Sequence, residues 1–129
     1  MDKKIRKYLL ILILISFLIR AMAAWLIELG NDEVYYRLYA LYPDWSHFDH
    51  PPMVGWIIQL FSLNLTLHSE FFLRLGFVVT GTFSTWIIFL IGKEISDDLT
   101  GLYAAILYTS SIYCSIIAGI FIMPDGPQV

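Results

Sequence analysis

The stretch GNDEVYYRLYALYPDWSHFDHPP, from Gly30 to Pro52, lies between long apolar segments of this 129-residue chain. It holds four of the eleven acidic residues, two of the three histidines and four of the eight tyrosines. Glu28, two residues before it, adds a fifth acid. Side chains capable of chemistry are therefore concentrated in one segment between hydrophobic ones, which predicts a site at a membrane surface.

The overall composition is that of a membrane protein. Hydrophobic residues make up 58% of the chain and charged residues only 15%, whereas soluble domains carry about 25% charged residues. No basic patch suited to nucleic acid is present, so nucleic acid is not an expected partner. The single cysteine, Cys114, lies in an apolar run and can form neither an internal disulfide nor a Cys/His metal motif.

The apolar residues 8–29 follow a basic start made by Lys3, Lys4, Arg6 and Lys7. A membrane core needs roughly 20 helical residues, so this run predicts a first span. The basic start should stay in the cytoplasm, which places Gly30 and the residues after it outside. Residues 21–23 also resemble a signal-peptide cleavage site, but the apolar run continues past them, which favours a retained span.

Two more spans are expected, over residues 71–91 and 99–123, on either side of a short cytoplasmic turn. The chain is thus predicted to be an all-α, multi-pass protein of the cytoplasmic (inner) membrane, with an outer loop at 30–70. Arg20 interrupts the first span and is expected to extend to the outer interface. Small and hydroxyl residues in the third span predict close packing against other helices (Thr109, Ser110, Ser111, Ser115, Gly119).

The outer loop is predicted to contain two short helices. Asn31 or Asp32 can cap the first, which should stop at Pro43. A second helix over residues 53–61 should begin after Pro52 and lie along the membrane surface. At helical spacing, one face of the first helix gathers an acid and three tyrosines (Asp32, Tyr35, Tyr36, Tyr39).

Asp32 is a candidate general base, because a carboxylate at the membrane edge can take the proton of a substrate hydroxyl. Glu33 is its neighbour on a helix, so the two side chains diverge and cannot form a close carboxylate pair. The alternative is that residues 31–33 are only an acidic helix cap.

A second candidate group is His47-Phe48-Asp49-His50. His50 could contact a phosphate, and a metal ion could use a subset of these residues, although three ligands from one tetrapeptide would be strained. The alternative is a polar turn before a helix. Arg74, one turn into the second span, either reaches lipid headgroups or contacts an anionic substrate.

Four landmarks in this order resemble the N-terminal part of the GT-C membrane glycosyltransferases. The chain is most similar to the dolichyl-phosphate-mannose-protein mannosyltransferase-like family (glycosyltransferase family 39) and to the lipid A aminoarabinose transferases. The landmarks are Asn31-Asp32-Glu33-Val34-Tyr35-Tyr36, Phe48-Asp49-His50-Pro51-Pro52-Met53, Glu70-Phe71-Phe72-Leu73-Arg74-Leu75 and Pro124-Asp125.

The resemblance implies transfer of a sugar from a polyprenyl-phosphate donor to a lipid, glycan or protein acceptor on the outer face of the membrane. It implies that Asp32 and Glu33 are the catalytic acids. It also implies substrate-binding roles for six residues, of which Asp49 is a candidate ligand for a divalent metal ion (Tyr35, Tyr36, Asp49, His50, Arg74, Asp125).

Relatives of this kind continue through many more spans. Three helices form part of an active-site wall but hardly a closed cavity, so we expect the 129 residues to be the front part of a longer enzyme and inactive alone. The alternative function is that of a small membrane subunit or lipid-binding assembly protein whose outer loop docks a partner.

Overall fold

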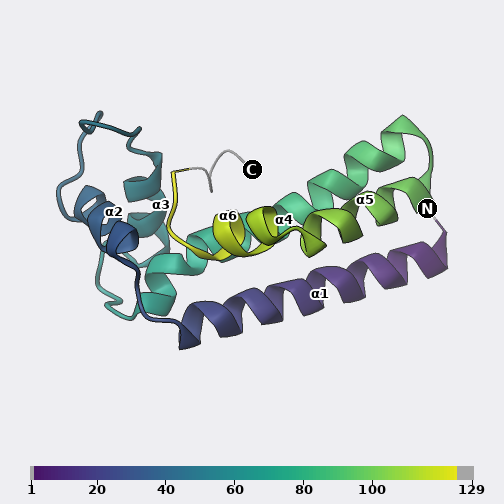
Figure 1. Ribbon diagram of the computed structural model, residues 1–129, viewed down its shortest axis with the longest axis horizontal. Coiled ribbons are helices and arrows are strands. Elements are labelled where there is room, and N and C mark those ends of the chain that lie inside the picture. Colours follow the sequence, from purple (N-terminus) through teal and green to yellow (C-terminus); the bar gives the residue numbers. More distant parts are fainter. Residues whose placement is uncertain (1, 125–129) are drawn as a thin grey trace.

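The computed structural model describes residues 2–124, and these are helical with no strand. Asp125, one of the predicted site residues, lies outside the described residues. The chain forms two long helices, three shorter ones and a π-helical segment followed by one last turn (Figure 1). In chain order they are α1 Lys3–Leu26, α2 Asn31–Leu41, α3 Met53–Phe61, α4 Glu70–Ile95, α5 Asp98–Ser110, η1 Tyr113–Ile117 and α6 Ala118–Ile120.

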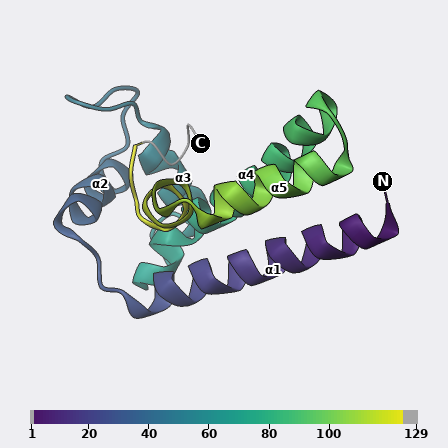
Figure 2. The same cartoon turned by 45° about the vertical axis from the view of Figure 1, so that its right-hand side comes forward.

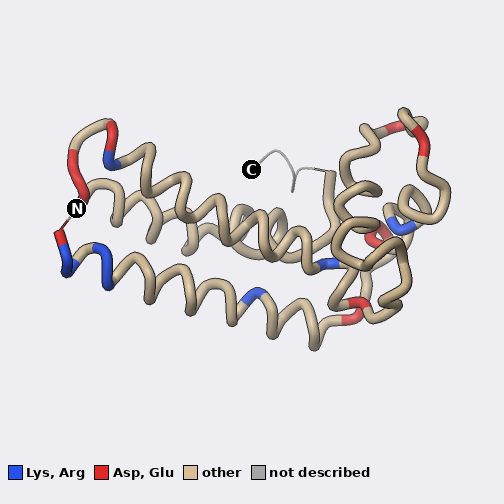
Figure 3. The backbone as a smooth tube through the Cα atoms, turned by 180° about the vertical axis from the view of Figure 1, so that it is seen from behind, with Lys and Arg blue, Asp and Glu red and all other residues tan. Residues whose placement is uncertain are grey.

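Two helices, α1 and α4, are long and apolar enough to cross a membrane. They overlap the predicted spans 8–29 and 71–91 but differ from them at the ends. Helix α1 begins earlier because the Asp2 carboxylate caps it, accepting from the backbone N–H of Lys4 at 2.9 Å. Figure 3 shows that charged residues lie mostly at the two ends of the helical bundle, as a membrane core between the ends requires.

The prediction of a single third helix over 99–123 is wrong. Helix α5 ends at Ser110, and the helical segment that follows is bent from it by 75°. Ser111 has extended backbone angles, and its side chain accepts from the N–H of Cys114 at 3.4 Å, so it ends one helix and caps the next. The described chain therefore has two continuous candidate spans, and a third only if the bent pair crosses as one.

Arg20 does not extend to the outer interface, contrary to the prediction. Its side chain is 1% exposed, between α1, α4 and the broken segment. Its Nε donates to the carbonyl oxygen of Ser115 at 3.1 Å, and Nη1 lies 3.5 Å from the hydroxyl of Thr82. The sequence could not show this burial because the break at Ser111 brings the Ser115 carbonyl to α1.

Helix α4 lies at the centre of the bundle, with α1 and α5 alongside it (Figures 1 and 2). Glycines allow the closest of these approaches. A Cβ atom on Gly92 would lie 2.9 Å from the Cα of Gly101, and one on Gly81 would lie 2.8 Å from the Cα of Gly119. Gly119 therefore packs as closely as its small size predicts.

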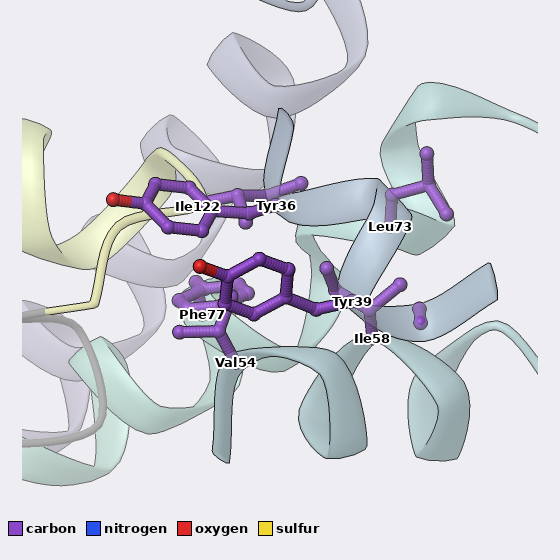
Figure 4. Close-up of a cluster of buried hydrophobic side chains, with 8 residues drawn as sticks. Tyr36, Tyr39, Val54, Ile58, Leu73, Phe77 and Ile122 are labelled. Carbon is purple, nitrogen blue, oxygen red and sulfur yellow. The ribbon is translucent and has the colours of Figure 1, made fainter. Parts of the chain in front are cut away.

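Helices α2 and α3 close the end of the bundle that carries the polar side chains of the outer loop. Helix α3 covers the same residues as the predicted 53–61 helix, and it packs between α2 and α4. Figure 4 shows the apolar cluster where the three helices meet, joined by one residue that follows α6 (Tyr36, Tyr39, Val54, Ile58, Leu73, Phe77, Ile122).

The start of α2 differs from the prediction in two ways. Its N-cap is Gly30, not Asn31 or Asp32, and the Glu33 carboxylate accepts from the Gly30 N–H at 2.9 Å. The buried face of the helix runs through Glu33, Tyr36 and Ala40, with Tyr39 beside it, whereas Asp32 is exposed. Asp32 and Tyr36 lie one turn apart on the predicted face, but Asp32 is exposed and Tyr36 is buried.

Candidate functional site

A buried ion pair between Glu33 and Arg74 is the centre of this end of the molecule. The two side chains are 2% and 0% exposed. Arg74 Nε lies 2.7 Å from Glu33 Oε1, and Nη2 lies 2.5 Å from Oε2. This is the bidentate arrangement in which the planar guanidinium matches a carboxylate.

Arg74 also ties α4 to the end of α1. Nη2 donates to the carbonyl oxygen of Glu28 at 2.9 Å, and Nη1 donates to those of Ala24 and Ile27. These carbonyls lie in the last turn of α1 or just after it, where no further helical turn supplies N–H donors. The sequence suggested that Arg74 reaches lipid headgroups or contacts an anionic substrate. Neither alternative included this role, in which the buried guanidinium bonds the Glu33 carboxylate and carbonyl oxygens at the end of α1.

Glu33 is equally occupied. Besides Arg74 and the Gly30 N–H, its Oε1 accepts from the backbone N–H of Ile122 at 3.0 Å. Ile122 follows α6, so one carboxylate joins the start of α2, the start of α4 and the segment after the helix break. Because both of its oxygens accept hydrogen bonds from protein donors, Glu33 suits a positioning role better than proton transfer.

Asp32 lies beside this pair in a different environment. It is exposed and lines an open pocket of about 350 Å³ with its neighbours in α2 and two residues from the segment after α6 (Gly30, Asn31, Glu33, Phe121, Met123). Within residues 2–124, neither of its carboxylate oxygens takes part in the hydrogen bonds that hold the bundle end together. The structure thus separates two adjacent acids, one fixed in the protein and one open to a ligand.

A second polar group forms where the loop before α3 folds onto α2. The Asp49 carboxylate accepts from the Tyr39 hydroxyl at 2.5 Å and from the Tyr35 hydroxyl at 2.8 Å. These two bonds, the Tyr39 bond first, lower the pKa of Asp49 below its usual value. Burial and the bond to Asp49 raise the pKa of Tyr39, so its hydroxyl stays protonated and donating.

The two loop histidines pack on the same tyrosines. The ring of His47 stacks on Tyr39 with centroids 3.7 Å apart, and His50 meets Tyr36 edge-on at 5.6 Å. The predicted Asp49, His50, Tyr35 and Tyr36 therefore lie in one group. His47 and Tyr39 belong to it too, and the signal for Tyr39 was its place one helical turn after Tyr35.

Removing the Tyr39 hydroxyl should raise the pKa of Asp49 toward its usual value. The lowered pKa stabilises the docked loop above the usual carboxyl pKa of about 4, and this contribution is lost as pH falls through the lowered value. The Tyr39→Phe variant should therefore lose it at a higher pH. The pKa can be read from the ¹³C shift of the Asp49 carboxyl carbon during titration, with Tyr42→Phe as control because Tyr42 is 74% exposed on the same helix. An unchanged pKa in Tyr39→Phe would contradict this assignment.

The described residues do not form a metal site. Within residues 2–124, no three His, Cys, Asp or Glu side chains gather in a way that could hold a metal ion. Asp49, the candidate ligand, instead has two tyrosine hydroxyls as its partners. The described residues therefore supply no ligand set for a divalent ion.

Comparison with known proteins gives one result. The family described as "Dolichyl-phosphate-mannose-protein mannosyltransferase" matches residues 49–129, more than half of the chain. No curated protein and no solved structure matches. The matched part contains Asp49, His50 and Arg74, whereas Asp32 and Glu33 precede it, so the Glu33–Arg74 ion pair links the matched part to the unmatched one.

Proposed function

The chain belongs to the dolichyl-phosphate-mannose-protein mannosyltransferase family, and from this premise we propose that it transfers a sugar from a polyprenyl-phosphate donor to an acceptor hydroxyl. It is a GT-C-type, glycosyltransferase-like membrane protein. We further propose that residues 1–129 are the N-terminal part of the membrane domain, in the cytoplasmic membrane, with α2 and α3 on the extracytoplasmic side. The basic residues before α1 support this orientation.

The observation that carries the proposal is the contrast between the two adjacent acids. Glu33 is buried and bonded to Arg74 and to two backbone N–H groups. Asp32 is exposed at a pocket that the segment after α6 also lines. Because the ion pair fixes the first turn of α2, it also fixes the backbone from which Asp32 extends. A general base needs this combination of a fixed backbone and a free carboxylate.

In the proposed reaction, the acceptor oxygen attacks the anomeric carbon of the donor sugar while Asp32 accepts the hydroxyl proton. The bond between the anomeric carbon and the phosphate oxygen breaks, and the electron pair leaves with the polyprenyl phosphate. Attack opposite the leaving group inverts the anomeric centre. Phosphate leaves readily as an anion, so no acid needs to protonate it.

The group formed by the tyrosines of α2 and by Asp49 and His50 of the loop before α3 is proposed to bind the substrate. Tyr35, Tyr36, His50 and Asp49 offer hydroxyl, imidazole and carboxylate groups in one place, and sugars are bound through such donors and acceptors. We keep Asp125 as a proposed substrate contact on the basis of the family resemblance. Arg74 is assigned to positioning, since its buried guanidinium is engaged by the Glu33 carboxylate and by carbonyl oxygens at the end of α1.

The test is a transfer assay in native membranes. Membranes that contain the protein, and membranes from a strain that lacks it, receive a polyprenyl-phosphate donor with a radiolabelled sugar. Label should move to an acceptor only when the protein is present, and a nucleotide sugar supplied without the lipid donor should not replace it. Equal transfer in both membranes would contradict the proposal and favour the alternative, a subunit that docks a partner without catalysis.

A further inference from the structure

The segment after α6 forms one wall of the pocket that Asp32 lines. Phe121 and Met123 of this segment line the pocket together with the first residues of α2. Between them, the backbone N–H of Ile122 donates to the buried Glu33 carboxylate at 3.0 Å. The position of this wall relative to Asp32 therefore depends on what holds the segment.

Arg20 holds the segment from inside the bundle. Its side chain is 1% exposed, and its Nε donates to the carbonyl oxygen of Ser115 at 3.1 Å. Arg20 lies six residues before the end of α1, so it is about 9 Å inside that end. A charge at this depth is costly away from its acceptors, so the bond to Ser115 resists movement of the segment away from α1.

Gly119 makes this close contact possible. A Cβ atom on Gly119 would lie 3.0 Å from Arg20 Nε, and a Cβ atom on Gly81 would lie 2.8 Å from the Cα of Gly119. Gly119 is therefore packed between the guanidinium and α4, where a larger residue does not fit without displacing the segment. Phe121 follows two residues later, so a displacement at Gly119 passes directly to the wall.

The buried ion pair holds the other end of the segment. The Arg74 guanidinium lies over the ring of Phe121, 5.4 Å from its centroid, and Glu33 accepts from the Ile122 N–H. The wall thus continues a segment that two buried arginines contact, Arg74 at the site and Arg20 deeper in the bundle. Because both ends are held, the wall keeps one position relative to α2.

We propose that Arg20 is a positioning residue that sets the wall of the Asp32 pocket from within the membrane part of the bundle. Arg20 lies outside the described lining of this pocket, so it acts through residues 115–123. An effect of Arg20 on sugar transfer rests on the proposed function, whereas its effect on the wall does not.

The test measures hydrogen exchange of the Ile122 amide by NMR, on the full chain in detergent micelles. This amide is protected while it donates to Glu33, so its exchange reports opening of the wall. Arg20→Gln removes the charge and shortens the side chain, so exchange should be at least about tenfold faster. Arg20→Lys should restore most of the protection, since its ammonium can donate to the Ser115 carbonyl. Equal acceleration at the buried Phe89 of α4 would indicate a general loss of stability and overturn the proposal.

A second variant serves if Arg20→Gln fails to fold. Gly119→Ala pushes the segment away from Arg20 and should also speed exchange of the Ile122 amide. Gly92→Ala is the matched control, because its Cβ would lie 2.9 Å from the Cα of Gly101, in a contact between α4 and α5. Wild-type exchange in both Arg20→Gln and Gly119→Ala would refute the proposal, as would fast exchange in Gly92→Ala.

The transfer assay then separates this proposal from the proposed function. Arg20→Gln should lower kcat at least about tenfold, because a small displacement in a positioned site is costly, and Arg20→Lys should recover most of it. Fast exchange of the Ile122 amide with wild-type kcat would overturn the positioning role. Absence of transfer by the wild-type protein would instead contradict the proposed sugar transfer, and the exchange rates would still decide whether Arg20 sets the wall.

Discussion

Membranes in which asparagine replaces Asp32 should transfer sugar at least about 100-fold more slowly than wild-type membranes, because general-base catalysis contributes about this much or more. Asparagine keeps the size and hydrogen-bonding capacity of the side chain but cannot accept the acceptor's proton. In the described part of the chain, the hydrogen bonds that hold α2 to α4 and to the segment after α6 come from Glu33 and not from Asp32. The fold and the binding of the lipid donor should therefore be retained.

The matched control is Asp44→Asn. Asp44 is another exposed carboxylate of the outer loop, and an asparagine there can still accept from the Trp45 N–H as the carboxylate does at 2.7 Å. Transfer should be unchanged in this variant. Wild-type transfer with asparagine at position 32 would show that another group is the base, and it would leave the membership of the family untouched.

Replacing Arg74 with methionine should destabilise the protein by about 3–5 kcal/mol, the usual cost of removing one partner from a buried ion pair. The Glu33 carboxylate would remain buried, with only the N–H groups of Gly30 and Ile122 to stabilise its charge. The carbonyl oxygens at the end of α1 would also lose their donor. The change in the free energy of unfolding can be measured by denaturant titration in micelles.

Two further variants make this measurement specific. Lys93→Met removes a partly exposed ion pair between Lys93 at the other end of α4 and Asp98 of α5, 3.0 Å apart, and should cost less than about 1 kcal/mol. Combining Arg74→Met with Glu33→Gln removes the stranded charge, so the double variant should be more stable than Arg74→Met alone. A cost for Arg74→Met as small as that for Lys93→Met would contradict the role of the ion pair.

The sequence by itself determined the elements whose causes are local. Apolar runs of sufficient length predicted α1 and α4, and Pro52 and Pro43 marked the start of α3 and the end of α2. The family followed from short motifs in a fixed order, and the comparison supports it over residues 49–129. These features could be predicted because helix length, hydrophobicity and proline geometry act over neighbouring residues.

Only the tertiary structure decided how distant residues pair. Glu33 and Arg74 are 41 positions apart, and Arg20 reaches the Ser115 carbonyl only because α5 breaks at Ser111. From the sequence, Glu33 could be only part of an acidic helix cap, and Arg20 and Arg74 could be arginines at the membrane interface. The periodicity of one helix does not show which other helix packs on it, so the sequence could not reveal these pairings. The cost of burying a charge makes such pairing obligatory once the helices pack. That packing fixes Glu33 and leaves Asp32 beside it open to a ligand.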